Sequence, residues 1–125
     1  MTVVCDTSVL IDVLRRHPPA LEYVIMLGAR PRCCELSRVE LLHGLRSHEI
    51  SSAGRLIEWI DWAPVSSEIA ERAGELGRTY RASHRLDVAD LCIAATALVD
   101  GLSLATANVK HFPMFPDLLP PYEQL

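Results

Sequence analysis

The chain has 125 residues, enough for one domain, and half of its residues are hydrophobic, at the upper end of the range for globular proteins. Its formal net charge of −4 argues against broad, non-specific binding to nucleic acid. No apolar run approaches the ~18 residues needed to cross a membrane, and no basic, cleavable leader precedes the first predicted strand. We therefore expect a single cytoplasmic domain over residues 1–125 that does not bind membranes.

The first half of the chain alternates short apolar runs with helical patterns. A β-branched run ending on Asp6 predicts a strand, and helical spacing from Val9 up to the proline pair at 18–19 predicts a helix. A second apolar stripe over residues 21–27 is ended by Gly28, and residues 31–36 are predicted to form a strand. Ser37 and Glu40 have the spacing of a capping box that would open the next helix.

The second half repeats this alternation. Ser51 and Ser52 are predicted to cap a helix, followed by a strand at 62–65 and a helix from Ser66 or Ser67 to about Ser83. An alanine-rich helix is predicted to end at residues 100–101, before a buried strand at 102–105 and a proline-rich, extended tail. Strands alternating with helices indicate an α/β fold, with a small, mostly parallel central sheet of about four or five strands flanked by helices.

Four cysteines lie in apolar runs, without the spacing of a zinc site. We expect reduced thiols packed as small hydrophobic side chains. The four are Cys5, Cys33, Cys34 and Cys92.

Four polar side chains occupy comparable places after predicted strands or in the first turn of the helix that follows. They are Asp6, Glu40, Asp90 and Asn108. The carboxyl ends of parallel strands meet at one edge of a sheet, so these side chains should lie together. Converging carboxylates repel one another unless a cation joins them, which predicts a hard divalent metal suited to phosphodiester hydrolysis.

Each of these residues also has a purely structural interpretation. Thr7 or Ser8 could cap a helix whose positive end favours Asp6, and Glu40 could merely complete its capping box. Asp87 could be an N-cap, with Asp90 favoured by the helix dipole three residues later. Taken one at a time these interpretations are the stronger ones, but the matching positions of all the residues favour a shared site.

The sequence resembles the PIN-domain nucleases, and more narrowly the VapC toxins of bacterial toxin–antitoxin pairs, over nearly its whole length. The resemblance rests on Asp6-Thr7-Ser8 after a hydrophobic strand, Val39-Glu40-Leu41 after Ser37, Asp90-x-x-Ile93-Ala94-Ala95-x-Ala97 and Thr106-x-Asn108-x-x-x-Phe112. It implies a PIN-like fold and a Mg²⁺- or Mn²⁺-dependent endoribonuclease that cuts structured RNA such as tRNA or rRNA. It also implies a homodimer that a VapB-type antitoxin inhibits, in a heterotetramer or larger complex.

The same resemblance implies roles for individual residues. Asp6 and Asp90 match the metal-ligating aspartates, and Glu40 matches a second acidic position that binds metal or positions water. Asn108 stands where many relatives have a fourth acid, and its neutral side chain favours one firmly held metal over two. Residues near these ligands or near phosphate would be Thr7, Ser8, Thr106 and Asp87. Apart from the resemblance, the cations expected to contact RNA are Arg15, Arg38 and Lys110, the alternative being that they are ordinary solvated surface charges.

Three other interpretations compete with the nuclease. A PIN-like module could bind RNA or a protein without cutting, and Asn108 keeps this alternative open. A haloacid-type phosphatase would need Asp-x-Asp, but position 8 is Ser. A dinucleotide-binding site would need a glycine-rich turn after the first strand, and none is present.

Overall fold

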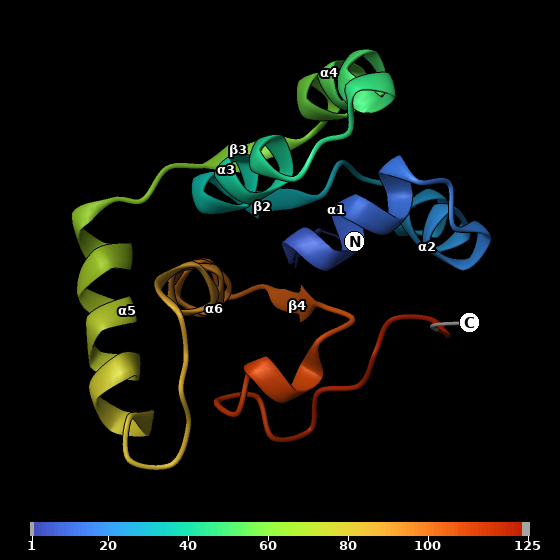
Figure 1. Cartoon of the computed structure of the whole chain (residues 1–125). Helices are drawn as coiled ribbons and strands as arrows, with labels where there is room; N and C mark the ends of the chain where they lie inside the picture. The colour runs from blue at the N-terminus through green and yellow to red at the C-terminus, as the bar shows by residue number, and fades with distance from the viewer. Residues whose placement is uncertain (1, 124–125) are drawn as a thin grey trace.

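The computed structural model describes residues 2–123 as a parallel sheet between layers of helices (Figure 1). The strand order is β3-β2-β1-β4, and every neighbouring pair is parallel. The strands are β1 (Val3–Cys5), β2 (Arg32–Cys34), β3 (Asp61–Ala63) and β4 (Ser103–Ala105). The helices are α1 (Thr7–Leu14), α2 (Pro18–Leu27), α3 (Glu35–His43), α4 (Ile50–Trp59), α5 (Ser67–Tyr80) and α6 (Val88–Asp100), with short 3₁₀ turns η1 (Ser47–Glu49) and η2 (Val109–His111). The prediction of a small parallel α/β fold is confirmed.

The alternation of side chains along each strand divides the core into two halves. Val4 and Leu104 point to the face covered by α5 and α6, and buried Phe112 of the tail packs into the same cluster. Val3 and Cys5 point to the opposite face, toward α1, α2 and α4. Figure 1 shows these two groups of helices on either side of the sheet. β1, which lies inside the sheet and is buried on both faces, accordingly consists of apolar residues alone.

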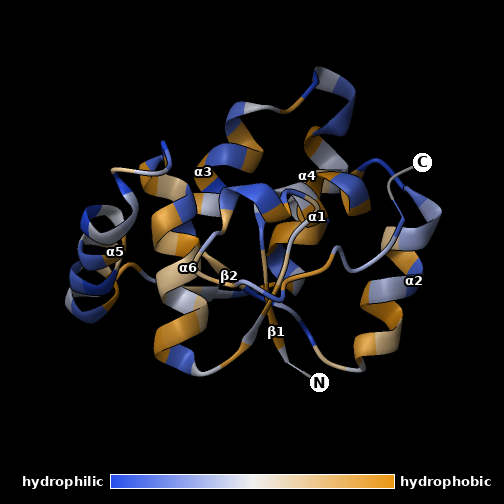
Figure 2. Ribbon diagram, turned by 90° about the horizontal axis from the view of Figure 1, so that it is seen from below, coloured by the Kyte–Doolittle hydropathy of each residue, from blue (hydrophilic) through white to orange (hydrophobic). Residues whose placement is uncertain are grey.

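The hydropathy of the helices matches these positions. In Figure 2 hydrophobic residues run through the strands and along much of α6, whereas α5 is largely hydrophilic on the outside. The alanines of α6 allow it to approach α5 closely, and Ala94 and Ala95 are fully buried. All four cysteines are buried and free, as predicted. Within residues 2–123 no helix is long and apolar enough to span a membrane.

Two predicted helix starts are wrong. The chain passes from β2 directly into α3, with Cys34 at the N-cap position, so Ser37 lies inside the helix and the predicted capping box with Glu40 does not form. Within the described residues the buried Ser37 hydroxyl has no hydrogen-bond partner. The predicted cap at Ser51–Ser52 is also wrong, because η1 leads straight into α4 at Ile50 and both serines lie in the first turn.

Smaller differences concern single residues at element ends. β3 covers residues 61–63 instead of 62–65, because Pro64 has no N–H with which to continue a ladder. α5 ends at Tyr80, and the three residues that follow form a turn. Asp6 itself is the N-cap of α1, whereas Thr7 and Ser8 were the predicted caps.

Candidate active site

The site lies where the chain changes direction across the sheet. From β1 the chain proceeds outward through β2 to β3, then returns through α5 and α6 to place β4 on the other side of β1. The crevice beyond the carboxyl ends of such neighbouring strands is the usual ligand site in an open α/β sheet. Here a cleft of about 510 Å³ opens at that point. It is lined by Asp6, Thr7, Ser8, Ile11, Asp12, Glu40, Asp87, Asp90, Ala107, Asn108 and His111.

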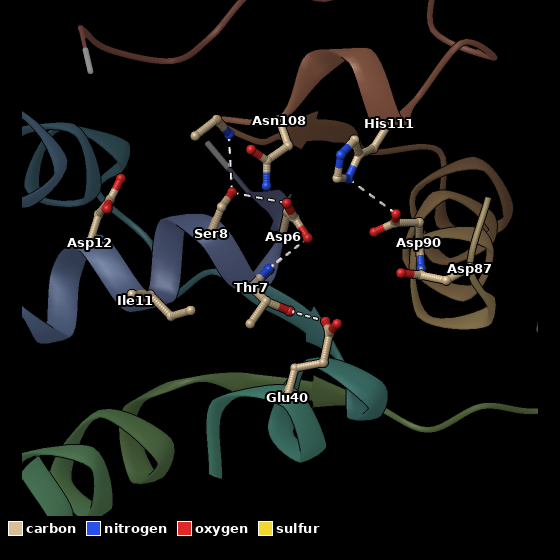
Figure 3. Close-up of a pocket in the computed structure, with 11 residues that line it drawn as sticks. Asp6, Thr7, Ser8, Ile11, Asp12, Glu40, Asp87, Asp90, Asn108 and His111 are labelled. Carbon is tan, nitrogen blue, oxygen red and sulfur yellow. Dashed lines mark hydrogen bonds and ion pairs between the residues drawn. The ribbon is translucent and has the colours of Figure 1, made fainter. Parts of the chain in front are cut away.

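Asp6 is the most firmly held carboxylate of the cleft. It follows β1 directly and is 4% exposed, and its Oδ1 accepts a 2.8 Å hydrogen bond from the backbone N–H of Thr7. Its Oδ2 accepts hydrogen bonds from the hydroxyls of Ser8 (2.9 Å) and Thr106 (2.6 Å). With donors on both oxygens, the carboxylate is fixed in one orientation at the floor of the cleft (Figure 3).

The same two hydroxyls connect Asp6 to the segment after β4. The Thr106 hydroxyl accepts the backbone N–H of Asn108 at 2.9 Å, and the Ser8 hydroxyl accepts that of Ala107 at 3.1 Å. Each hydroxyl therefore accepts a hydrogen bond from a backbone N–H and donates one to Asp6. This arrangement places the Asn108 side chain at the mouth of the cleft, beside the aspartate (Figure 3).

Glu40 reaches the cleft from α3, on the opposite side from Asn108 (Figure 3). Its Oε1 accepts a 2.6 Å hydrogen bond from the hydroxyl of Thr7. Thr7 therefore contributes its backbone N–H to Asp6 and its side chain to Glu40. One residue at the start of α1 thus sets the positions of two carboxylates.

Asp87 and Asp90 come from the start of α6. Asp87 is the N-cap, and its Oδ1 accepts the backbone N–H of Asp90 at 2.9 Å. The Asp90 carboxylate lies 3.3 Å from Nδ1 of His111. Burial, followed by the carboxylates of Asp87 and Asp6, raises the pKa of Asp90 to about 7. The cleft thus holds more negative charge than its own side chains neutralise.

Two of the three predicted RNA-contacting cations are occupied elsewhere. Arg15 forms a 3.1 Å ion pair with Glu49. Arg38 binds both carboxylate oxygens of Glu35 and stacks over the ring of Trp62 at 4.4 Å. Lys110 is exposed on η2, next to His111.

Two residues that line the cleft, Asp12 and His111, were not among the site residues predicted from the sequence. Asp12 lies one helical turn after Ser8, so the four-residue spacing could have placed both on the face toward the cleft. Its Oδ2 accepts a 2.7 Å hydrogen bond from the hydroxyl of Tyr122 in the tail. No local sequence pattern predicts that contact, because the two residues are 110 positions apart.

The carboxylates of the cleft suit a hard divalent cation, although they do not form a complete coordination site as they stand. Among residues 2–123 no three His, Cys, Asp or Glu side chains are close enough to form a metal site as they stand. Carboxylates are nevertheless the ligands that Mg²⁺ and Mn²⁺ prefer, and Mg²⁺ usually binds through one or two of them together with water. Burial and, after it, the carboxylates of Asp87 and Asp6 raise the pKa of Asp90, and a cation bound there would favour its charged form.

Comparison with known proteins identifies the family. The PIN domain model matches residues 3–113. The chain belongs to the PIN domain family. This PIN domain is 45% identical over 121 residues to Ribonuclease VapC19 of Mycobacterium tuberculosis, an alignment covering 94% of this chain and 97% of that protein. Ribonuclease VapC10 of the same organism is 40% identical over 125 residues, covering 96% of this chain and 92% of the relative.

Solved structures agree with this assignment. A toxin–antitoxin complex from Klebsiella pneumoniae contains a chain that is 27% identical and superposes with a TM-score of 0.81, covering 98% of this PIN domain and 99% of that chain. VapBC2 of Rickettsia felis, solved with a DNA fragment from its promoter, also gives a TM-score of 0.81, with 19% identity and coverage of 96% and 97%. The fold is therefore that of the VapC group.

Proposed function

We propose that this PIN domain is the ribonuclease toxin of a toxin–antitoxin pair and hydrolyses RNA phosphodiester bonds with Mg²⁺ or Mn²⁺. The observation that carries the proposal is the acidic cleft, in which Asp6, Glu40 and Asp90 arrive from three elements at the carboxyl edge of one sheet. Relatives named as ribonucleases, at 45% and 40% identity over nearly the full chain, support the same activity.

Asp6 and Asp90 are the residues proposed to hold the cation, and Glu40 either joins them or orients the attacking water. When bound, the cation supplies an activated water and stabilises the charge that builds on the leaving oxygen. Asp6 suits its role because its orientation is fixed by donors on both oxygens. The neutral Asn108 side chain at the mouth of the cleft can orient water or phosphate but adds no charge for a second firmly held cation.

Three hydroxyl residues act as positioning residues in this proposal. Ser8 and Thr106 hold Asp6, and Thr7 holds Glu40. Such partners of metal ligands commonly matter about 10–100-fold in metal affinity or activity. Asp87 caps α6 and thereby places Asp90.

The proposed partner is a VapB-type antitoxin, acting on a homodimer in a heterotetramer or larger assembly in the cytoplasm. The relative from Klebsiella pneumoniae was solved as a toxin–antitoxin complex. Ile25 and Met26 of α2 are 76% and 85% exposed, and Met26 lines a groove of about 410 Å³ between α2 and the tail. An apolar groove beside a helix suits the helix-in-groove binding expected of an antitoxin peptide.

A non-catalytic RNA- or protein-binding module remains the second candidate. Asn108 in place of an acid and the absence of a finished metal cluster among residues 2–123 are the observations that favour it. A binding module would not need three carboxylates fixed by dedicated hydroxyls. We therefore rank it below the nuclease.

Sequencing of cellular RNA ends after induction tests the proposal. Induction of the wild-type chain should arrest growth and create new RNA ends, and Asp6→Ala should abolish both while circular dichroism shows an unchanged fold. Co-expression of the small protein encoded by the neighbouring reading frame should restore growth. Tolerance of high expression without new RNA ends would favour the binding module.

A further inference from the structure

RNA must overcome negative charge to reach this cleft. Five carboxylates line it, from Asp6, Asp12, Glu40, Asp87 and Asp90, and the chain as a whole has a net charge of −4. A bound divalent cation offsets part of this charge locally. An RNA strand passing beyond the reacting phosphate still needs cations at the rim, because phosphate contacts supply most of the non-specific affinity for nucleic acid.

Two of the three cations expected from the sequence to contact RNA are engaged in ion pairs. The carboxylates of Glu49 and Glu35 already bind Arg15 and Arg38. Releasing Arg15 would break an ion pair between the end of α1 and η1, and releasing Arg38 would break an ion pair within α3 and the contact with the ring of Trp62. The phosphate contacts must therefore be sought on another side of the cleft.

A side groove leads from the cleft to a free arginine. The groove has a volume of about 250 Å³ and is lined by Arg85, Leu86, Asp87, Asp90 and His111. Three of these residues also line the acidic cleft, so the two hollows are continuous. Arg85 is exposed, and within residues 2–123 its guanidinium forms no ion pair or hydrogen bond, not even with Asp87 in the same groove.

A second free cation is the chain neighbour of His111, which lines both the cleft and the side groove. Lys110 is exposed on η2 beside His111, and it lines a further hollow of about 500 Å³ that also contains His84. The ammonium of Lys110 likewise has no partner within the described residues. Arg85 and Lys110 are thus contributed by different segments, the α5–α6 connection and the segment after β4. Arg85 lines the side groove together with His111, and Lys110 precedes His111 in the chain.

We propose that the RNA strand leaves the acidic cleft across His111 and that Arg85 and Lys110 bind its phosphates. The inference rests on the proposed ribonuclease function and adds a direction to it, because it assigns the RNA path to the side of α6 and η2. Among the described residues Arg85 forms no ion pair with either carboxylate of its groove, Asp87 or Asp90, so it is available for a bidentate contact to phosphate. Lys110, on the other side of His111 in this proposal, contributes a point charge to another phosphate of the strand.

The test measures RNA binding in an Asp6→Asn background, which prevents cleavage. A fluorescein-labelled RNA hairpin is titrated by fluorescence anisotropy at several salt concentrations and constant Mg²⁺. The variants are Arg85→Gln, Lys110→Gln and the double substitution. The matched control is Arg30→Gln, because Arg30 is also exposed but precedes β2, at the opposite edge of the sheet.

Each cleft-side substitution should weaken binding and lower the slope of log K against log salt by about 0.7–0.9, with the double variant losing about twice that. Arg30→Gln should leave the slope unchanged. The inference is overturned if Arg85→Gln and Lys110→Gln behave like Arg30→Gln while the Asp6→Asn protein still binds RNA. If the wild type cuts no RNA and the Asp6→Asn protein binds none, the proposed function itself fails, and this inference with it.

Discussion

Thr106→Val removes the hydroxyl that holds Asp6 while keeping the shape of the side chain. Thr106 is fully buried, donates a 2.6 Å hydrogen bond to Asp6 and accepts the N–H of Asn108. A hydrogen bond to a charged group is worth about 1.5–3 kcal/mol, and an unpaired buried N–H adds to the loss. We expect a loss of about 3 kcal/mol in the free energy of unfolding and a fall in Tm of roughly 10 °C.

The substitution should also impair the site itself. With one donor fewer, Asp6 is less well oriented, and the half-saturating Mg²⁺ concentration for RNA cleavage should rise about tenfold. Thr106→Ser is the matched control, because it keeps the hydroxyl and loses only a buried methyl, worth about 1 kcal/mol. The assay is cleavage of a labelled RNA over a Mg²⁺ titration, with Tm measured on the same samples.

The comparison of the two variants separates positioning from simple stability. Thr106→Ser should be moderately less stable but bind Mg²⁺ like the wild type. Equal Mg²⁺ dependence in the wild type and Thr106→Val would refute the argument that this hydroxyl positions Asp6.

Three further predictions concern the charge of the cleft, the tail and the partner surface. Burial and neighbouring carboxylates raise the pKa of Asp90 from 3.8 to about 7, so the unfolded chain loses this proton at lower pH than the folded one. The free energy of unfolding of the metal-free protein should therefore fall as the pH rises from about 4 to about 7, and that of Asp90→Asn should fall less. Denaturant unfolding in EDTA at several pH values tests this. The same pH dependence in both proteins would contradict it. Tyr122→Phe removes the 2.7 Å hydrogen bond to Asp12 and should cost about 1 kcal/mol in denaturant unfolding; an unchanged midpoint would show that the contact adds nothing. Met26→Asp should weaken antitoxin binding about tenfold or more in calorimetry, and wild-type affinity would place the antitoxin elsewhere.

The position of the candidate site could be predicted from the sequence because it depends on topology alone. Once short apolar strands alternate with helices, parallel pairing brings their carboxyl ends to one edge, and Asp6, Glu40 and Asp90 must gather there. The end of α2 could also be predicted, because a glycine follows its apolar stripe and Gly28 adopts the left-handed conformation that ends the helix.

The partners of those residues could not be predicted, because they are distant in sequence. Thr106 and Asp6 are 100 positions apart, and Thr7 and Glu40 are 33 positions apart. The start of α3 was predicted wrongly, because Ser37 and Glu40 have the spacing of a capping box but the strand continues directly into the helix. The ion pair of Arg15 with Glu49 likewise joins positions 34 apart. The ion pair of Arg38 with Glu35 is local, but it depends on α3 beginning at Glu35, before the predicted start at Ser37.

The most direct test of the account is RNA cleavage by the purified protein with and without divalent metal. We predict cleavage with Mg²⁺ or Mn²⁺, none in EDTA, and none by Asp6→Asn under any of these conditions. Cleavage that persists in EDTA, or full activity of Asp6→Asn, would contradict a metal-dependent ribonuclease site built on Asp6.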